Sequence, residues 1–466
     1  MDLTFCKQVK DEQIYTGDFE LNKMFEHILN LNLFLYCCCR LYFYFHSEGR
    51  YILIDTYNEW HVISCFFSKK IQRSILPKHI CELMSRLRNT IDIQCCLEDF
   101  DNEFNYINTR NGVFNYLTKE LLPKDKKHKF TYQLKAAYIE NSTIDDAPCF
   151  KKFCETSLGG DKEKIILLLQ SMGYLLSPLS NAKKCFIFLG APNSGKSQLL
   201  HLIECILGKE FISNIQLEKL GARFASAQLS TKRLNICGEL SSRPLRDIET
   251  FKLVVGGDTL TGEFKNKDMF QFDNRCKLLF SGNILPPIHN EDVTTAFIDR
   301  LVILRFPYSI PQEERDYELC NKLTKEMDII FSLAIDTLPA LIKKNYEFVK
   351  PADSLKLMND YSFQQTNIDT FVDEWCVIGD ELKVHSSMLY EAYKDFCNEN
   401  LIKPISQNLF SQKIGSIYGV ENSRFRLNGS KSMRGFIGIS LKFNTEQDSD
   451  LYSDTDLKND ERNLKI

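Results

Sequence analysis

A run of eight residues near the middle of the sequence has the composition of a triphosphate-binding loop. It reads Gly190-Ala191-Pro192-Asn193-Ser194-Gly195-Lys196-Ser197 and lies between a strand-like run, 185–189, and a helical pattern that continues to about residue 207. The backbone N–H groups of such a loop, the N-terminus of the following helix and a lysine ammonium together surround dense negative charge. The sequence therefore predicts nucleotide binding by this loop, with Lys196 on the phosphates and the Ser197 hydroxyl on Mg²⁺.

Three further polar side chains adjoin strand-like runs downstream of this loop and are candidates for a hydrolytic site. Glu239 ends one run, where a carboxylate near the γ-phosphate can activate a water molecule. Asn283 follows the next run, and its amide can position that water or contact the γ-phosphate. Arg300 precedes a third run, from which a guanidinium can stabilise transition-state charge across a subunit boundary. A glutamate at a strand end is also often only solvated, and this alternative for Glu239 stays open.

The C-terminal part of the sequence carries a local excess of positive charge. Between residues 401 and 443 there are seven basic residues and one acidic residue, whereas the whole chain has a formal net charge of −4. Because the overall charge gives no basic field, contacts with nucleic acid must come from such local clusters. Lys413, Arg424 and Arg426 are the expected DNA contacts in this segment, and a merely solvated charged face is the alternative.

The elements that must position the nucleotide site are those of an α/β domain. Short apolar runs alternate with helical patterns between residues 185 and 307, which is typical of a three-layer domain with a mainly parallel sheet. The expected strands are 185–189, 234–237, 277–280 and 301–305. Residues 313–348 are expected to be helical. The first 150 residues mix short aromatic strands with helical stretches, so an α+β domain is expected at the N-terminus.

The C-terminal elements are expected to be two amphipathic helices, 387–400 and one that starts near Ser406, and then two strands separated by Asn428-Gly429. Two helices followed by a hairpin indicate a winged-helix domain. The last segment carries seven acidic and three basic residues with few apolar ones, which predicts disorder. The expected domains are 1–150 (α+β), 151–350 (nucleotide-binding α/β), 366–443 (winged helix) and the acidic tail 444–466.

Composition excludes several classes of protein. With 44% apolar and 26% charged residues, the chain of 466 residues is typical of a globular protein rather than a disordered or fibrous one. Its most apolar run, 31–45, is shorter than the roughly 20 residues of a membrane helix and contains Asn32 and Arg40. The start of the chain has no pattern of a secretory signal. We therefore expect a cytoplasmic protein without a membrane partner.

The order and spacing of Lys196, Glu239, Asn283 and Arg300 resemble those of the superfamily 3 helicases, a branch of the AAA+ ATPases encoded by viruses and mobile elements. Within this branch the chain is most similar to the phage and plasmid primase-helicases and to the poxvirus primase-helicase. The resemblance covers roughly residues 40–443, and its other segments are 111–113, 149–150 through 173–175, 224–233, 252–258, 280–283, 299–301, and 389–393 through Phe436. Many relatives have two adjacent acids at the end of the second strand, where this chain has Gly238-Glu239. Mg²⁺ would therefore rely on Ser197, Glu239 and water.

The resemblance implies that residues 151–350 form a hexameric AAA+ ring that hydrolyses ATP, with Arg300 acting on the nucleotide of the neighbouring subunit. It also implies a hairpin at 261–272 that faces DNA in the central channel. Lys265 and Lys267 would contact phosphates there, and neighbouring aromatic side chains would contact bases. The alternative for this segment is a solvated turn whose phenylalanines belong to the core.

Together these features predict an ATP-dependent replicative DNA helicase of a phage, plasmid or other mobile element that acts on single-stranded and forked DNA. One alternative is a DNA-binding AAA+ ATPase that loads or remodels replication proteins without unwinding, and another is a nonenzymatic DNA-binding protein. Primase activity is not expected, because the only suggestive acidic pairs upstream, Asp18/Glu20 and Asp99/Asp101, are typical surface acids. A separate primase or polymerase is the expected partner, in the cytoplasm of a bacterial host or at a viral replication site.

Overall fold

The computed structural model describes residues 9–38, 40–54, 59–241, 245, 248–266, 268–286, 297–400, 404–415, 417, 419–426 and 432–442. The chain divides into two compact units. The first consists of residues 1–240, 253–284 and 302–351, and the second of residues 241–252, 285–301 and 352–466. No helix in the described ranges is both long and apolar enough to cross a lipid bilayer.

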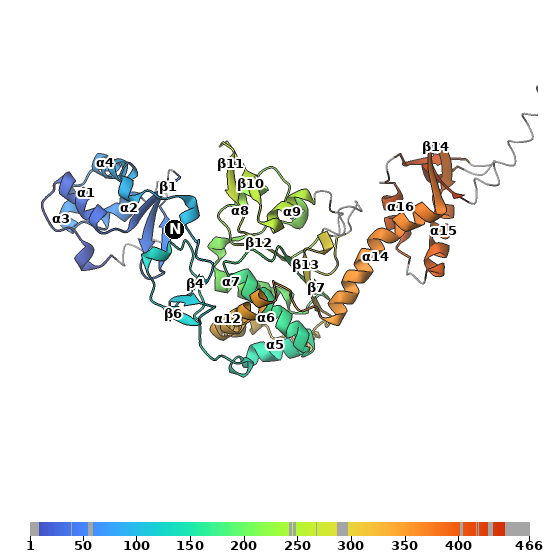
Figure 1. The fold of residues 1–466 in the computed structure, drawn as a ribbon, viewed down its shortest axis with the longest axis horizontal. Helices are drawn as coiled ribbons and strands as arrows, with labels where there is room; N and C mark the ends of the chain where they lie inside the picture. Colours follow the sequence, from blue (N-terminus) through green and yellow to red (C-terminus); the bar gives the residue numbers. More distant parts are fainter. Residues whose placement is uncertain are drawn as a thin grey trace, which may run out of the picture. The chain divides into compact units, whose positions relative to one another are not determined.

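The N-terminal part of the first unit has the expected α+β composition (Figure 1). Its antiparallel sheet has the order β1-β2-β3, with β1 at Phe34–Cys37, β2 at Arg40–Phe45 and β3 at Arg50–Leu53. The helices of this part are α1 (Leu21–Asn30), α2 (Glu59–Ser64), α3 (Lys69–Ser74) and α4 (Pro77–Arg88). Helix α4 buries Ile80, Leu83, Met84 and Leu87, whose spacing places them on one face. They belong to a hydrophobic core that also contains residues of all three strands.

A second small sheet connects this part to the region that follows. Its strands are β4 (Tyr106–Asn108), β5 (Val113–Asn115) and β6 (Glu120–Leu122), which pair antiparallel in that order. Ile107, Val113 and Phe114 belong to the same buried cluster as residues of the helices α5 (Pro148–Leu158) and α6 (Lys162–Leu176). The hydrophobic core thus continues across residue 150, and the domain boundary expected there stays a prediction.

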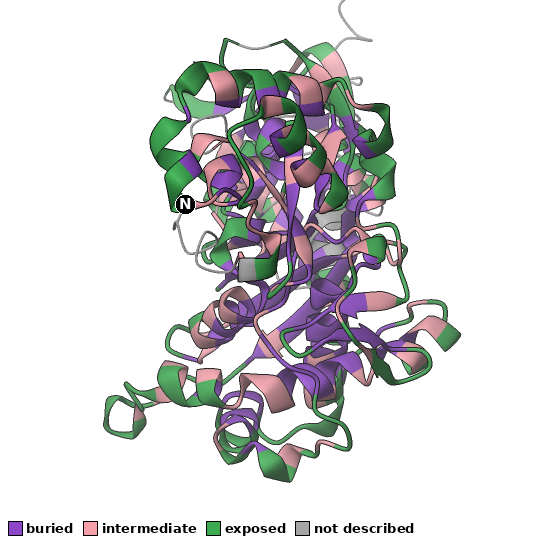
Figure 2. Ribbon diagram, turned by 90° about the vertical axis from the view of Figure 1, so that its left-hand side faces the viewer, coloured by how far each residue is buried: buried purple, intermediate pink, exposed green. Residues whose placement is uncertain are grey.

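A five-stranded sheet forms the centre of the first unit. Its order is β13-β7-β12-β9-β8, and the pairs β12–β7, β12–β9 and β8–β9 are parallel. The strands are β7 (Cys185–Gly190), β8 (Ile212–Ser213), β9 (Leu234–Cys237), β12 (Lys277–Gly282) and β13 (Leu301–Phe306). The four expected strands are confirmed, whereas β8 was not expected because two residues carry no periodic pattern. Figure 2 shows that these strands are mostly buried, as continuous apolar runs in a parallel sheet predict.

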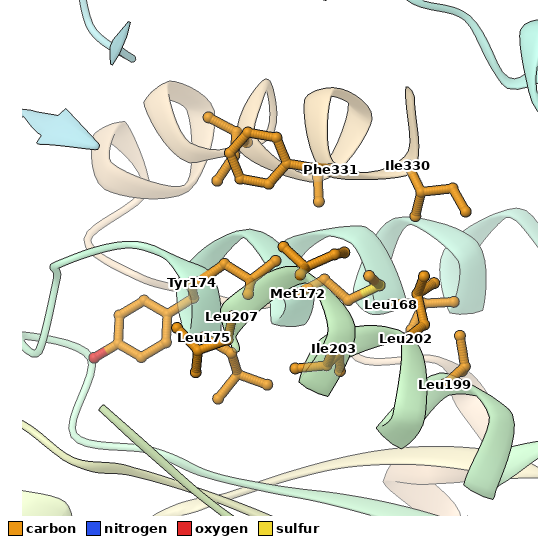
Figure 3. Close-up of a cluster of buried hydrophobic side chains, with 14 of the residues drawn as sticks. Leu168, Met172, Tyr174, Leu175, Leu199, Leu202, Ile203, Leu207, Ile330 and Phe331 are labelled. Carbon is orange, nitrogen blue, oxygen red and sulfur yellow. The ribbon is translucent and has the colours of Figure 1, made fainter. Parts of the chain in front are cut away.

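Helices α6 and α7 (Lys196–Leu207) pack together with α12 (Met327–Ile335) beside the sheet. Figure 3 shows that Leu168 and Met172 of α6, Leu202 and Ile203 of α7, and Phe331 of α12 gather in one apolar cluster. Burying an aliphatic side chain of this size contributes about 1.5–3 kcal/mol. The cluster therefore fixes the helix that begins at the last residues of the glycine-rich motif. Two further helices, α11 (Leu319–Lys325) and α13 (Leu338–Lys343), confirm the helical character expected for 313–348.

A β-hairpin extends from the first unit (Figure 1). It consists of β10 (Thr259–Gly262) and β11 (Phe270–Asp273), which pair antiparallel with Gly262 opposite Phe270. This hairpin is the one expected at 261–272. The short helix α8 (Ala225–Leu229) packs closely on β10. A Cβ at Gly262 would lie only 3.1 Å from the Cα of Ala227. Helix α9 (Glu249–Gly256) precedes the hairpin in the chain.

The second unit contains the long helix α14 (Ala352–Trp375), the helices α15 (Ser386–Glu399) and α16 (Gln407–Ile414), and an antiparallel sheet of order β14-β16-β15. The strands are β14 (Cys376–His385), β15 (Glu421–Phe425) and β16 (Met433–Leu441). Phe371 contacts Tyr393, Phe396 and Phe410 at the centre of this unit's core. The two helices and two strands expected here are confirmed. Strand β14 was not expected, because a register shift between Ile378 and Lys383 interrupts its alternation. The Asn428-Gly429 turn and the tail 444–466 lie outside the described residues.

Candidate functional site

The glycine-rich motif, residues 190–197, forms the turn between β7 and α7 and is called the glycine loop below. Gly190 is the last residue of β7, and Gly195, with a φ of 89°, is the N-cap of α7. Asn193 also has a positive φ, of 57°. Glycine adopts such angles at little cost, and asparagine is among the few other residues that do so readily. The loop therefore has a local conformation that its residue types favour.

Close packing explains both of the outer glycines of the loop. A Cβ at Gly190 would lie 2.0 Å from the carbonyl oxygen of Phe306 at the end of β13. A Cβ at Gly195 would lie 2.6 Å from Cε2 of Phe153 and 2.9 Å from Oγ of Ser157, both on α5. No side chain fits at either position without displacing its neighbours. The sequence reasoning missed this supporting role of α5.

Backbone hydrogen bonds fix the glycine loop to the segment that leaves the sheet after β13. The N–H of Ala191 donates to the carbonyl of Phe306 at 3.1 Å, and the N–H of Ile310 donates to the carbonyl of Asn193 at 3.1 Å. Nε of Arg315 in turn donates to the carbonyl of Ile310 at 3.1 Å. Residues 306–310 therefore run alongside the loop.

Lys196 bends back over the glycine loop. Its Nζ donates to the carbonyl oxygens of Gly190 at 2.9 Å and Ala191 at 2.6 Å, and to Oγ of Ser194 at 3.1 Å. The residue is buried, and this burial lowers the pKa of the ammonium group. A neighbouring anion favours the charged form of such a group. Ser197, in the first turn of α7, is exposed.

Strand register brings Glu239 and Asn283 to the same sheet edge as the glycine loop. Gly282 of β12 pairs with Leu189, the residue before Gly190, and Phe280 pairs with Cys237. Two residues beyond Cys237 lies Glu239, and the next residue, Leu240, donates its N–H to the carbonyl of Ser281 at 2.8 Å. The side chains of Glu239 and Asn283 are exposed. In open parallel sheets, ligands bind outside the carboxyl ends of the strands, where these residues lie.

Arg300 belongs to the second compact unit, whereas the other three expected catalytic residues belong to the first. It is half-buried, and its N–H donates to the carbonyl of Phe297 at 3.0 Å. In the chain it immediately precedes β13, while the glycine loop contacts Phe306 at the opposite end of that strand.

The connection of the β10–β11 hairpin presents a cation and two stacked rings. Lys265 is exposed, and Lys267 lies outside the described residues. The rings of Phe264 and Phe270 stack with centroids 5.5 Å apart and an interplanar angle of 16°. Phe272 is buried, as the alternative that places these phenylalanines in the core requires, whereas Phe270 is half-buried and Phe264 is exposed.

Polar contacts hold the base of this hairpin. Arg223 donates from Nε and from a terminal nitrogen to the two carboxylate oxygens of Glu263, at 2.9 and 2.8 Å. Oγ of Ser226 donates to the carbonyl of Thr261 at 2.7 Å. The hydrogen bond and the charge of the Arg223 guanidinium lower the pKa of Glu263. The strands are therefore anchored on α8 and its preceding loop, and the connection carrying Lys265 extends beyond this anchor.

The basic residues of the second unit differ in accessibility. Arg424 and Arg426 are exposed, as expected for DNA contacts. Lys413 is buried, with 8% of its surface accessible, which contradicts the expectation that it lies on the accessible face. The reason is its position on α16, three residues after the buried Phe410 and next to the buried Ile414.

Arg434 was not among the expected DNA contacts, although the structure places it directly opposite Arg424 in the β15–β16 pair. Both side chains are exposed. Like charges directly opposite each other in a sheet are destabilising, and an anion between them removes that cost. The signal available in the sequence was the spacing of the two arginines about the Asn428-Gly429 turn.

No group of three or more His, Cys, Asp or Glu side chains within the described ranges is arranged to hold a metal ion. Mg²⁺ usually keeps several waters and is bound through one or two protein oxygens together with substrate phosphates. The Ser197 hydroxyl and the Glu239 carboxylate, which are both exposed, are oxygen ligands of that kind.

Three family models match separate segments of the chain. The D5 N terminal like family matches residues 66–159, and the poxvirus D5 protein-like family matches residues 366–451. A family of unknown function, DUF5906, matches residues 188–300. This last segment contains the glycine loop together with Glu239, Asn283 and Arg300.

The chain is also similar to solved structures of the NrS-1 C-terminal region in its apo state. One of them aligns with 12% identity and a TM-score of 0.48 over 91% of this chain and 100% of that chain. Another aligns with 13% identity and a TM-score of 0.48 over the same shares. The two D5-type segments recognised in the sequence indicate a likeness to the primase-helicase-like proteins, and hence to replication-related NTPases.

Proposed function

We propose that the protein is an ATP-dependent replicative DNA helicase of a phage, plasmid or other mobile element. The observation that carries the proposal is the carboxyl edge of the parallel sheet, where strand register aligns Glu239 and Asn283 with the strand that leads into the glycine loop. The D5-type segments before and after this sheet in the sequence support a role in replication.

The glycine loop would bind the triphosphate of ATP. Its backbone N–H groups and the N-terminus of α7 supply partial positive charge, and Lys196 supplies a full one. The phosphate oxygens would replace the carbonyls of Gly190 and Ala191 as acceptors for the Lys196 ammonium. Burial lowers the pKa of this ammonium, and a bound anion would counteract that effect by stabilising the charged form.

Hydrolysis would use the two side chains beside the loop. The Glu239 carboxylate is proposed to accept a proton from the attacking water, and the Asn283 amide is proposed to orient that water against the γ-phosphate. Mg²⁺, held through Ser197, Glu239 and water, would neutralise charge on the phosphates when bound. Exposure of Glu239 and Asn283 leaves both accessible to a nucleotide on the loop.

Arg300 is proposed to act on the nucleotide of a neighbouring subunit in a hexameric ring. Arg300 immediately precedes β13 in the chain, where the superfamily 3 helicases that the sequence resembles have an arginine that acts across the subunit boundary.

DNA is proposed to contact two surfaces. Lys265, Lys267 and the Phe264–Phe270 stack would grip single-stranded DNA, since ammonium groups suit phosphates and aromatic rings suit bases. Arg424, Arg426 and Arg434 would contact duplex phosphates, and the β15–β16 strands would then act as the wing of a winged-helix domain. Lys413 is left out of this surface because it is buried.

A strand-displacement assay tests the proposal. The full chain is incubated with a labelled forked duplex in Mg²⁺ and ATP, beside the same chain with Lys196→Ala. Release of the labelled strand by the unsubstituted chain alone is the expected result. Hydrolysis of ATP without any release, at concentrations that saturate the fork, would identify a loading or remodelling ATPase instead.

A further inference from the structure

We propose that Tyr308 is the platform on which the base of the bound nucleoside triphosphate stacks. This inference rests on the proposed nucleotide site and adds to it a subsite for the base. Tyr308 lies between two residues that bond to the glycine loop, because Phe306 accepts from Ala191 and Ile310 donates to Asn193, both at 3.1 Å. The backbone of Tyr308 therefore passes directly beside the loop.

A second contact places the tyrosine ring independently of this backbone path. Gly159, at the C-terminus of α5 with a φ of 71°, is so close to the ring that a Cβ there would lie 2.8 Å from Cε2 of Tyr308. The last turn of the same helix carries Ser157, which underlies Gly195 of the glycine loop. Two positions at the end of α5, Ser157 and Gly159, therefore contact the glycine loop and the ring of Tyr308 respectively.

The ring of Tyr308 stays partly exposed although Gly159 lies close to it. Tyr308 keeps 53% of its surface accessible, although it contacts Gly159, and is thus one of the large exposed aromatic side chains of the first unit. An aromatic ring that is held by neighbouring backbone and keeps this much exposed surface can stack with a flat ligand. Nothing larger than a glycine at position 159 would leave room for this arrangement.

The chemistry of this position favours a nucleobase. The ribose separates the triphosphate from the base, so a base attached to phosphates on the glycine loop must lie to the side of that loop. The segment 306–310 and the end of α5 border the loop on such a side. Stacking on a single ring carries little discrimination between bases, because every base has a π-face. The subsite is therefore expected to accept nucleoside triphosphates with any of the bases.

Calorimetric titration of the full chain tests this subsite with two probes, one that carries a nucleoside and one that does not. One probe is the β,γ-imido analogue of ATP, and the other is inorganic tripolyphosphate, which has no base. Removing the ring in Tyr308→Ala should raise the Kd of the ATP analogue about tenfold, the size expected for one stacked base, and leave the Kd of tripolyphosphate unchanged within twofold. Tyr308→Phe should bind both probes as the unsubstituted chain does, because it keeps the ring.

Two controls separate this inference from the proposed function. Tyr317→Ala removes a tyrosine that is 82% exposed and lies outside the segment bonded to the loop, and it should change neither Kd. Lys196→Ala should weaken both probes, because it acts on the phosphates. If Lys196→Ala weakens both probes while Tyr308→Ala weakens neither, or weakens both equally, the stacking role is wrong and the phosphate site stands. If Lys196→Ala has no effect on either probe, the nucleotide site itself is wrong, and the base subsite falls with it.

Discussion

The glycine loop and the basic segment of the second unit are both short sequence signals, but they differ in how far the tertiary structure determines whether their residues can act. The outer glycines of the glycine loop, Gly190 and Gly195, act through backbone conformation or close approach. The lysine and arginines of the basic segment act only if their charges reach solvent. The structure keeps Arg424 and Arg426 exposed and buries Lys413.

This difference shows which kind of motif is safe to interpret from sequence. A motif whose function depends on local φ angles and on missing side chains specifies its own geometry, because few other residues could take those positions. A count of charges specifies no geometry, since position on a helix or strand decides which charges are accessible. Arg434 shows the converse case: the charge count did not single it out, but the strand register places it opposite Arg424.

The largest effect is expected from Lys196→Ala. The change removes the one side-chain cation of the glycine loop and leaves the carbonyls of Gly190 and Ala191 without its hydrogen bonds. ATP hydrolysis should fall to the level of a blank in a phosphate-release assay. Lys265→Ala, at an exposed lysine of the hairpin, is the matched control and should retain basal hydrolysis in the absence of DNA. Equal losses in the two variants would mean that the loop has no special part in the reaction.

Glu239→Gln is expected to separate binding from hydrolysis. The amide keeps the shape of the carboxylate but cannot accept a proton, and loss of such a base typically costs about 10²- to 10⁴-fold in rate. Turnover and the Kd for the ATP analogue are measured on the same preparation, and the Kd should stay within a few-fold of the unsubstituted value. A parallel loss of affinity would assign Glu239 chiefly to the metal ion.

The paired arginines of the second unit should contribute to binding of duplex DNA. If each contacts one phosphate, replacing Arg424 and Arg434 by alanine should lower the slope of log K against log salt by about 1.8, which is about 0.9 per contact. Lys413→Met keeps the buried aliphatic stem and should leave the slope unchanged. Binding is measured by anisotropy at several salt concentrations. A reduced slope in Lys413→Met would show that this lysine reaches the phosphates after all.

The smallest effect is expected from Lys265→Ala on single-stranded DNA. Loss of one phosphate contact should lower the salt dependence by about 0.7 for each subunit engaged, with basal ATP hydrolysis unchanged. Arg223→Ala serves as the structural comparison, because it removes the ion pair with Glu263 at the base of the hairpin. An unchanged slope and unchanged unwinding in Lys265→Ala would identify the hairpin connection as a solvated turn.

Much of the fold could be predicted because its signals are local. The strands β7, β9, β12 and β13 are mostly apolar runs, and helices such as α15 show their buried face in the spacing of Leu389, Tyr393 and Phe396. Strands β8 and β14 could not be predicted in this way. The first has two residues, and the second breaks its register between Ile378 and Lys383, so neither carries a period long enough to recognise.

The sequence by itself determined the glycine loop and its place between a strand and a helix, because the residue types that allow positive φ angles and close packing are few. Only the tertiary structure decided which distant residues stand beside it. Strand register brought Glu239 and Asn283 to the same sheet edge as the loop. Phe306 and Ile310, which flank Tyr308 in the chain, are hydrogen-bonded to the loop. These arrangements depend on pairings between segments that are far apart in sequence, and no local pattern records them. Burial of Lys413 is decided in the same way, by the core that α16 joins.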